Sequence, residues 1–165
     1  MSLREALMNQ LSYDRDTGLF TRKVETSPRT KKGEVAGHLN RRGYVQIKAL
    51  GKSHQAHRLA WLFVKGVWPT RHIDHIDGNP GNNSFRNLRE CNDSENSQNR
   101  TLAVNSISGL RGANFHQSSG MWQAEISVGG VRHYLGKHTT PELAHVAYLA
   151  AKAKLHTFQP VPRGE

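Results

Sequence analysis

Glycines at short intervals limit the first third of this chain to short strands. Turn signals stand at Gly18, Gly33, Gly43 and Gly51, and each favours a change of chain direction. Besides a first helix at the N-terminus, we predict strands at residues 19–24, 34–39, 44–50 and 52–56. Strands this short and this basic cannot bury a large core by themselves. We therefore expect them to pack on a helix at residues 55–64, where apolar side chains recur at helical spacing.

The middle of the chain combines a strand, a polar loop and a helix. We predict a strand at residues 71–76, a turn-rich loop at 77–84, a short ordered piece near 85–90 and a helix at 93–100. Asn92 and Glu95 have the spacing of a capping box, which places the start of that helix. Residues 70–100 are therefore predicted to form a ββα core.

Beyond residue 108 the pattern changes to three strands and one helix. We predict strands at residues 109–115, 122–128 and 131–135, and Gly129 and Gly130 form the hairpin turn between the last two. Thr140 caps a helix that starts at Pro141. The predicted fold class is α+β. Its parts are a basic, β-rich N-terminal region at 1–69, the ββα core at 70–100, a linker at 101–108, and a three-stranded antiparallel sheet plus helix at 109–165.

The net charge of +10 favours a polyanionic partner. Residues 1–69 contain 13 basic and 5 acidic side chains, residues 70–100 contain 4 and 5, and residues 101–165 contain 6 and 3. The basic excess thus lies mainly in the front strands, where Arg41, Arg42 and Lys48 are candidates for contacts to a DNA backbone. Two other interpretations stay open, namely a solvated basic face and a basic protein without any special partner.

Cysteine content and hydropathy narrow the class of protein further. Cys91 is the single cysteine, which excludes an intrachain disulfide and a zinc site built from several cysteines. We therefore expect a reducing cytoplasm. No apolar run reaches about 18 residues, so we expect no membrane-spanning helix. The N-terminus lacks the continuous apolar stretch of a signal peptide, so we expect none there.

The segment from His72 to Asn79 carries the side chains best suited to hydrolysis. Cleavage of a phosphodiester requires a base that activates water and a Lewis acid on the phosphate. An imidazole can take the proton of the water, and carboxylate and amide oxygens suit Mg²⁺ or Mn²⁺. Asp74 and His75 are neighbours on a predicted strand, so they can take these two roles on opposite faces if the backbone bends there. Asn96 on the following helix would complete the metal site.

Asp74 and His75, then Asn87 and then Asn96, resemble the HNH nuclease motif in its variant that ends in asparagine. The wider sequence from residue 11 to residue 100 is similar to phage HNH homing endonucleases, with the runs AHRLAWL, IDHIDGN and SENSQNR. The resemblance implies a ββα-metal core in which His75 is the general base. It implies that Asp74 and Asn96 bind a single divalent cation, Mg²⁺ or Mn²⁺. Asn87 is expected to bridge the loop and to orient His75 through a hydrogen bond.

Other polar residues near this motif have less specific interpretations. Three loop asparagines are predicted to be turn formers: Asn79, Asn82 and Asn83. His57, at the start of the apolar helix, is predicted to be a packed histidine with its hydrogen bonds satisfied. For His72 and Asp77, a position beside the site and a plain surface position stay equally open.

The C-terminal segment, from about residue 108 to residue 156, resembles the plant ethylene-response-factor (Apetala-two, ERF) DNA-binding domain. The resemblance rests on the runs WQAEI, LG and AHVAY. It implies a sheet that lies in the major groove with the helix behind it. The positions that match DNA-facing sites are Arg111, Asn114, His116, Glu125, Ser127, Arg132 and Tyr134. Plant members commonly carry arginine at three of these, where this chain has Asn114, His116 and Ser127, which implies a different target sequence. The alternative is a small structural sheet whose arginines are merely solvated.

Together these features predict a metal-dependent endonuclease that acts on double-stranded DNA. The resemblance suggests a phage-encoded homing enzyme in the cytoplasm of a bacterial host, without any membrane partner. One ββα site cuts one strand, so a monomer that nicks and a dimer that breaks both strands stay open. One rival is a non-catalytic, sequence-specific DNA-binding regulator with a decayed nuclease core, which the intact motif argues against. The other is a structural or RNA-binding basic protein.

Overall fold

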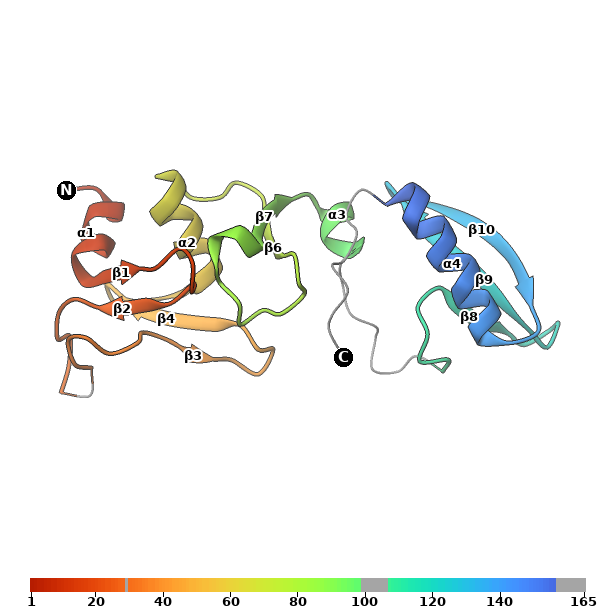
Figure 1. Cartoon of the computed structure of the whole chain (residues 1–165), viewed down its shortest axis with the longest axis horizontal. Coiled ribbons are helices and arrows are strands. Elements are labelled where there is room, and N and C mark those ends of the chain that lie inside the picture. The colour runs from red at the N-terminus through yellow and green to blue at the C-terminus, as the bar shows by residue number, and fades with distance from the viewer. Residues whose placement is uncertain (29, 99–106, 157–165) are drawn as a thin grey trace. The chain divides into compact units, whose positions relative to one another are not determined.

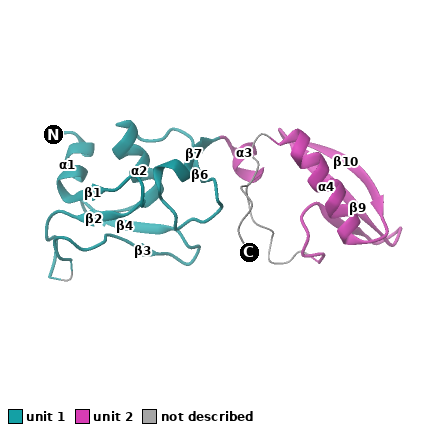
Figure 2. Cartoon of the chain, viewed as in Figure 1, with its two compact units in different colours: residues 1–91, 162–165 teal, residues 92–161 magenta. Residues whose placement is uncertain are grey.

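The computed structural model describes residues 1–28, 30–98 and 107–156. The chain divides into two compact units, of which unit 1 is Met1–Cys91 and unit 2 begins at Asn92 (Figure 2). The predicted boundary at residue 69 does not coincide with a boundary between units. The reason is that Ile73 and Leu88 lie in the same apolar core as Leu59. Most of the predicted linker, residues 101–106, lies outside the described residues, as does the end of the helix predicted at 93–100.

Unit 1 combines short helices with small antiparallel sheets (Figure 1). β1 pairs with β2, β4 lies between β3 and β5, and β6 pairs with β7. The elements are α1 (Leu3–Gln10), β1 (Leu11–Tyr13), β2 (Phe20–Arg22), β3 (His38–Leu39), β4 (Val45–Ala49), β5 (Lys52–Gln55), α2 (Ala56–Lys65), β6 (His72–His75), the 3-10 turn η1 (Phe85–Asn87) and β7 (Leu88–Cys91).

One apolar core holds unit 1 together. The β1–β2 pair contributes Tyr13 and Phe20, whose ring centroids lie 4.6 Å apart. Phe63 of α2 meets the Phe20 ring edge to face at 5.4 Å. Ile47 of β4 and Leu59 of α2 are fully buried in the same cluster. The short strands therefore pack on α2, as their length and the helical spacing predict.

One strand of unit 1 is much shorter than predicted. Of the strand expected at 34–39, only His38–Leu39 is extended as β3. The residues before it bond to β2 instead, because Glu34 O accepts the Arg22 N–H and the Ala36 N–H donates to Phe20 O. Gly37 then turns the chain with a φ of +114°, a conformation that favours glycine. A switch of partner strand explains the difference.

Unit 2 is a three-stranded antiparallel sheet with a long helix against one face (Figure 1). Its elements are α3 (Asp93–Gln98), β8 (Ala113–His116), β9 (Met121–Val128), β10 (Val131–His138) and α4 (Pro141–Leu155). β9 lies between β8 and β10. Gly112 passes so close to α4 that a Cβ there would lie 2.3 Å from the ring of Tyr148. The α+β class is confirmed, and within the described ranges no helix is long and apolar enough to cross a bilayer.

Local capping and turn signals correctly predict where several helices and strands of unit 2 begin or end. The Glu95 N–H donates to Asn92 Oδ1 at 2.9 Å and the Asn92 N–H donates to Glu95 Oε2 at 2.8 Å, which is the predicted capping box. Gly129 and Gly130 have φ of +57° and +83° at the β9–β10 turn. Thr140 accepts the Leu143 N–H at the start of α4. These ends follow from short-range chemistry and therefore from the sequence.

Candidate active site

His75 lies at the end of β6, where the strand enters the polar loop. It stands opposite Leu88 of β7 and is buried, with 4% of the residue exposed. Its Nε2 lies 3.3 Å from Oδ1 of Asn83. An amide oxygen only accepts hydrogen bonds, so in this orientation of the amide Nε2 carries the proton. A neutral His75 therefore keeps its basic lone pair on Nδ1.

Two ring-bearing side chains border the His75 imidazole. The ring of His57, from the first turn of α2, meets it edge-on at 5.1 Å and 81°. The ring of Tyr44, the residue before β4, lies 5.9 Å away. Burial lowers the pKa of His75 below its ordinary value, against the Asn83 hydrogen bond and nearby carboxylates, which raise it. The imidazole is thus neutral at neutral pH, which is the form a general base requires.

Asn87 ties together the loop that follows β6. Its Oδ1 accepts the Asp77 N–H at 3.0 Å, and its Nδ2 donates to Asp77 Oδ1 and to Asn82 O, both at 2.9 Å. Asp77 also accepts the Asn79 N–H at 2.8 Å and the Asn82 Nδ2 at 2.7 Å. Burial raises the pKa of Asp77, but these hydrogen bonds outweigh it, so the pKa is lowered. Asp77 therefore organises the loop.

Asn83, rather than Asn87, hydrogen-bonds the His75 ring. The prediction that Asn87 orients His75 directly is corrected here, because the amide of Asn87 is engaged within the loop. Asn83 is held in turn by the β1–β2 region. Tyr13 Oη donates to Asn83 O at 2.7 Å, and Gly18 lies against the Asn83 backbone. A residue expected to be only a turn former thus carries the contact to the imidazole.

Asp74 faces Arg89 across the β6–β7 pair. Nε and Nη2 of Arg89 donate to Oδ2 of Asp74 at 3.0 and 2.8 Å. The Asp74 side chain is 10% exposed and that of Arg89 21% exposed, so the guanidinium balances a largely buried carboxylate. The sequence motif does not point to Arg89, since its relation to Asp74 depends on the register of two strands that a long loop separates.

Asn96, the second predicted metal ligand, lies on α3 in unit 2 and is half-buried. Within the described ranges no group of three or more His, Cys, Asp or Glu could hold a metal ion. A site made of one carboxylate and one amide falls outside that class. Both groups offer hard oxygen ligands of the kind that Mg²⁺ prefers. By donor chemistry, Asp74 and Asn96 fit a hard divalent cation, and their joint role stays a prediction.

The sheet of unit 2 gathers most of the residues matched to the ERF family on one face. Ala124 and Ile126 of β9 are buried, and side chains alternate along a strand. The register pairs Asn114 with Gln123, Ser127 with Arg132 and Glu125 with Tyr134. The face turned away from α4 therefore carries Asn114, His116, Glu125, Ser127, Arg132 and Tyr134.

Arg111 differs from the other residues of that set. Its guanidinium donates to Ser97 O at 2.7 Å and to Gln98 O at 3.2 Å. Both carbonyls belong to the last two described residues of α3. In unit 2, Arg111 therefore ties its own segment to α3, a role that the family resemblance did not indicate.

The basic residues predicted to contact DNA from unit 1 are exposed. Arg41 and Arg42 lie in the turn between β3 and β4, and Lys48 lies on β4. Asn40 Oδ1 accepts the N–H groups of Arg42 and Tyr44, which fixes this turn directly before the ring that borders His75. Their contact with DNA stays a prediction.

His57 is buried as predicted, but its hydrogen bonds are not satisfied. Its Nδ1 has no hydrogen-bond partner among the described residues. Helical periodicity indicates burial of such a residue and says nothing about its partners. Burial, followed by the charges of His75 and Arg58, lowers the pKa of His57 to about 3. No sequence pattern indicates this pairing of two buried imidazoles.

This burial predicts a loss of stability in acid. The folded protein binds fewer protons than the unfolded chain between pH 6.5 and pH 3, so stability is complete above pH 6.5 and falls below it. For one imidazole the loss approaches about 1.4 kcal/mol per pH unit. Urea unfolding at several pH values should show this slope, and His57→Phe should make it shallower. Parallel curves for wild type and variant would contradict the burial of a neutral His57.

Residues 54–98, from β5 to the end of α3, match the family model described as HNH endonuclease. A solved structure titled "DNA binding and cleavage by the HNH homing endonuclease I-HmuI" is similar over 82% of this chain and 75% of that chain, with 22% sequence identity and a TM-score of 0.44. The comparison with curated proteins gave no match. The family match ends before β8, so the ERF resemblance stays a prediction. Residues 54–98 form an HNH endonuclease domain, and the chain is an enzyme of the HNH endonuclease type.

Proposed function

We propose that this chain cuts double-stranded DNA at specific sites, with His75 as the general base. One observation carries the proposal. Within the HNH segment, a buried neutral imidazole stands at the end of β6, directly after an acidic residue, and is held by Asn83. Phosphodiester hydrolysis needs a base of this kind next to a hard-cation ligand.

His75 is proposed to take the proton of the water that attacks the scissile phosphate. Burial keeps the imidazole neutral before the step. In the tautomer that donates from Nε2 to Asn83, Nδ1 carries the basic lone pair, and the hydrogen bond to Asn83 becomes charge-assisted once the ring is an imidazolium. Asn83 therefore both orients the base and stabilises its product. The family resemblance implies products with 5′-phosphate and 3′-hydroxyl ends.

Asp74 and Asn96 would hold a single divalent cation, Mg²⁺ or Mn²⁺. Bound there, the cation supplies Lewis-acid polarisation of the scissile phosphate. Arg89 fixes the orientation of the Asp74 carboxylate through two hydrogen bonds to the same oxygen. It also places a positive charge near the position of the anionic substrate, which favours phosphate binding.

Site selection is proposed to come from unit 2. Its sheet face carries arginine, asparagine and glutamate side chains, which can read base edges in a major groove. Arg41, Arg42 and Lys48 would add backbone contacts without sequence preference. The resemblance to phage homing endonucleases supports a homing role in a bacterial host.

Removal of divalent metal is expected to abolish nicking. The purified full chain should convert supercoiled plasmid to the open circular form with Mg²⁺ or Mn²⁺, and EDTA should stop the reaction. Resupply of metal in excess of EDTA should restore it. The measurement is the rate of conversion on agarose gels.

Two results would contradict this proposal. Cutting that persists in excess EDTA would exclude a divalent-metal nuclease. Absence of cutting with either metal, together with tight sequence-selective binding to a duplex, would favour the DNA-binding regulator instead.

A further inference from the structure

Arg22, the last residue of β2, is a buried cation for which the described part of the chain supplies no anionic partner. Only 8% of the residue is exposed, and Nη1 donates to Lys48 O at 2.8 Å. Among the described residues no carboxylate forms an ion pair with it. A guanidinium has five N–H donors, and buried charges are normally paired. The protein therefore holds a cation whose charge a further group can satisfy.

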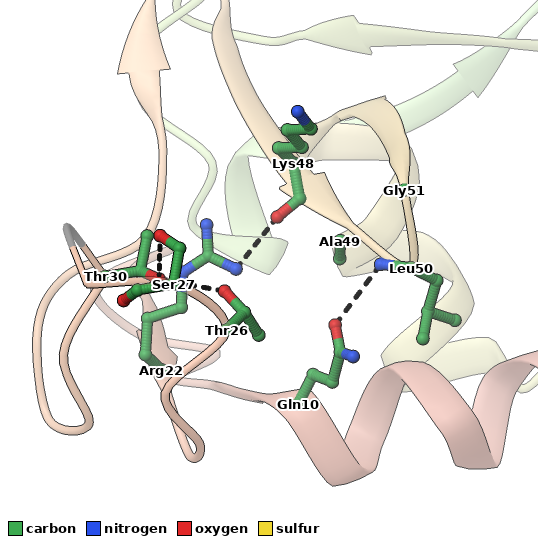
Figure 3. Close-up of a pocket in the computed structure, with 9 residues that line it drawn as sticks. All are labelled: Gln10, Arg22, Thr26, Ser27, Thr30, Lys48, Ala49, Leu50 and Gly51. Atoms are coloured by element: carbon green, nitrogen blue, oxygen red, sulfur yellow. Dashed lines mark hydrogen bonds between the residues drawn. The ribbon is translucent and has the colours of Figure 1, made fainter.

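The side chain of Arg22 lines an open cleft of about 400 Å³ (Figure 3). Lys48 of β4 and the hydroxyl residues Thr26, Ser27 and Thr30 line it as well, and the end of α1 and the β4–β5 turn complete it. None of the described residues that line the cleft is acidic. The residues that line the cleft thus bring the Arg22 guanidinium, three hydroxyls and the exposed side chain of Lys48, a combination that suits an anion.

The hydroxyls of this cleft form a connected group. Thr30 Oγ1 lies 2.9 Å from Thr26 Oγ1 and 2.9 Å from Ser27 Oγ. Each hydroxyl is both a donor and an acceptor and can rotate. They can therefore turn their protons towards an anion without any change of the backbone. Gln10 Oε1 accepts the Leu50 N–H at 3.2 Å and ties the opposite wall to the end of α1.

We propose that this cleft binds a phosphate group of the DNA backbone. Arg22 and Lys48 supply the charge, and the three hydroxyls supply further hydrogen bonds. The choice of DNA as the source of the phosphate rests on the proposed function, whereas the affinity for the anion follows from the cleft itself. The site shares no residue with the HNH motif and contacts no base, so its contribution to binding is independent of sequence.

The anion site is tested first with inorganic phosphate on the isotope-labelled full chain, followed by NMR at constant ionic strength. Phosphate should shift the Arg22 Nε–H signal and the amide signals of Thr26, Ser27 and Thr30 in a saturable manner, and chloride should not. Lys48→Gln should weaken this binding several-fold, and because Lys48 is exposed the variant should fold normally. Lys32→Gln removes the same charge from an exposed position outside the cleft and should leave the affinity unchanged. Shifts that are absent, or equal for chloride, would overturn the site.

The source of the phosphate is tested by the salt dependence of duplex binding. Loss of one phosphate contact should lower the slope of log Kd against log salt by about one and by the same amount for different sequences. Lys48→Gln is expected to show that loss. An unchanged slope, with phosphate binding intact in the NMR experiment, would overturn the assignment to the DNA backbone. If the wild type neither binds nor cuts DNA, the proposed function fails, and the phosphate titration still decides the anion site.

Discussion

The His75→Ala variant is expected to nick supercoiled DNA about 10²–10⁴-fold more slowly than the wild type, the usual contribution of a general base. His75 is buried, and its removal leaves the Asn83 amide oxygen without its imidazole partner. A loss of stability could therefore imitate a loss of chemistry. Thermal melting and the Kd for a duplex must be measured beside the nicking rate. We expect the Kd to change little, because the imidazole acts on the water.

His75→Gln separates the two effects. Its amide group can still donate to Asn83 Oδ1 and fills much of the same space, but it cannot take a proton near neutral pH. It is expected to melt closer to the wild type than the alanine variant and to be equally slow. His38→Ala removes an exposed histidine from β3 of the same unit and should cut at the wild-type rate. Metal-dependent cutting that survives both His75 substitutions would mean that another group is the base.

The fold was predictable from the sequence wherever interactions between residues close in the sequence determine the local structure. The capping box at Asn92, the paired glycines of the β9–β10 turn and the threonine cap of α4 all lie where they are expected. The prediction failed where distant segments compete for a partner. Residues 34–36 are predicted to share one strand with residues 37–39, yet they bond to β2. No strand is predicted at Leu11–Tyr13, which forms β1 by pairing with β2.

In the candidate site too, the sequence predicts what short-range patterns decide and misses what depends on distant segments. The motif identifies Asp74 and His75 by residue type and spacing. It does not identify Arg89, which reaches Asp74 only through the register of β6 and β7. It also cannot choose among the loop asparagines, because the path of the loop decides which of them faces His75. That path is set partly by Tyr13, seventy residues away in the sequence from Asn83.

Gly18 is a second residue, distant in the sequence, that helps to position the loop carrying Asn83. It lies in the β1–β2 turn with a φ of +75°. A Cβ at this position would lie 2.2 Å from Ser84 N and 2.3 Å from the carbonyl carbon of Asn83. The same turn holds the loop through Arg15 O, which accepts the Phe85 N–H at 2.9 Å. The backbone that carries Asn83 therefore fits against a glycine without any space for a side chain.

Gly18→Ala is expected to lower the free energy of unfolding by more than about 3 kcal/mol. The positive φ alone costs an alanine about 1–2 kcal/mol. The remainder comes from the overlap with backbone atoms, which cannot rotate away as a flexible side chain would. Relief of that overlap requires the loop to move, and the Asn83 amide moves with it. In the fraction that stays folded, nicking should therefore fall further than the loss of stability explains.

Gly66→Ala is the matched control, because Gly66 has a φ of +81° and nothing within 4 Å of its Cβ position. Its free energy of unfolding should fall only by the cost of the positive φ, about 1–2 kcal/mol. The nicking rate of the folded protein should stay unchanged. Urea unfolding gives both stabilities, and nicking rates corrected for the folded fraction give the activities. Equal losses of stability in the two variants, with equal activities, would show that the β1–β2 turn does not hold Asn83 in place. A larger loss in Gly18→Ala, with slower cutting, would place this turn among the elements that position the base.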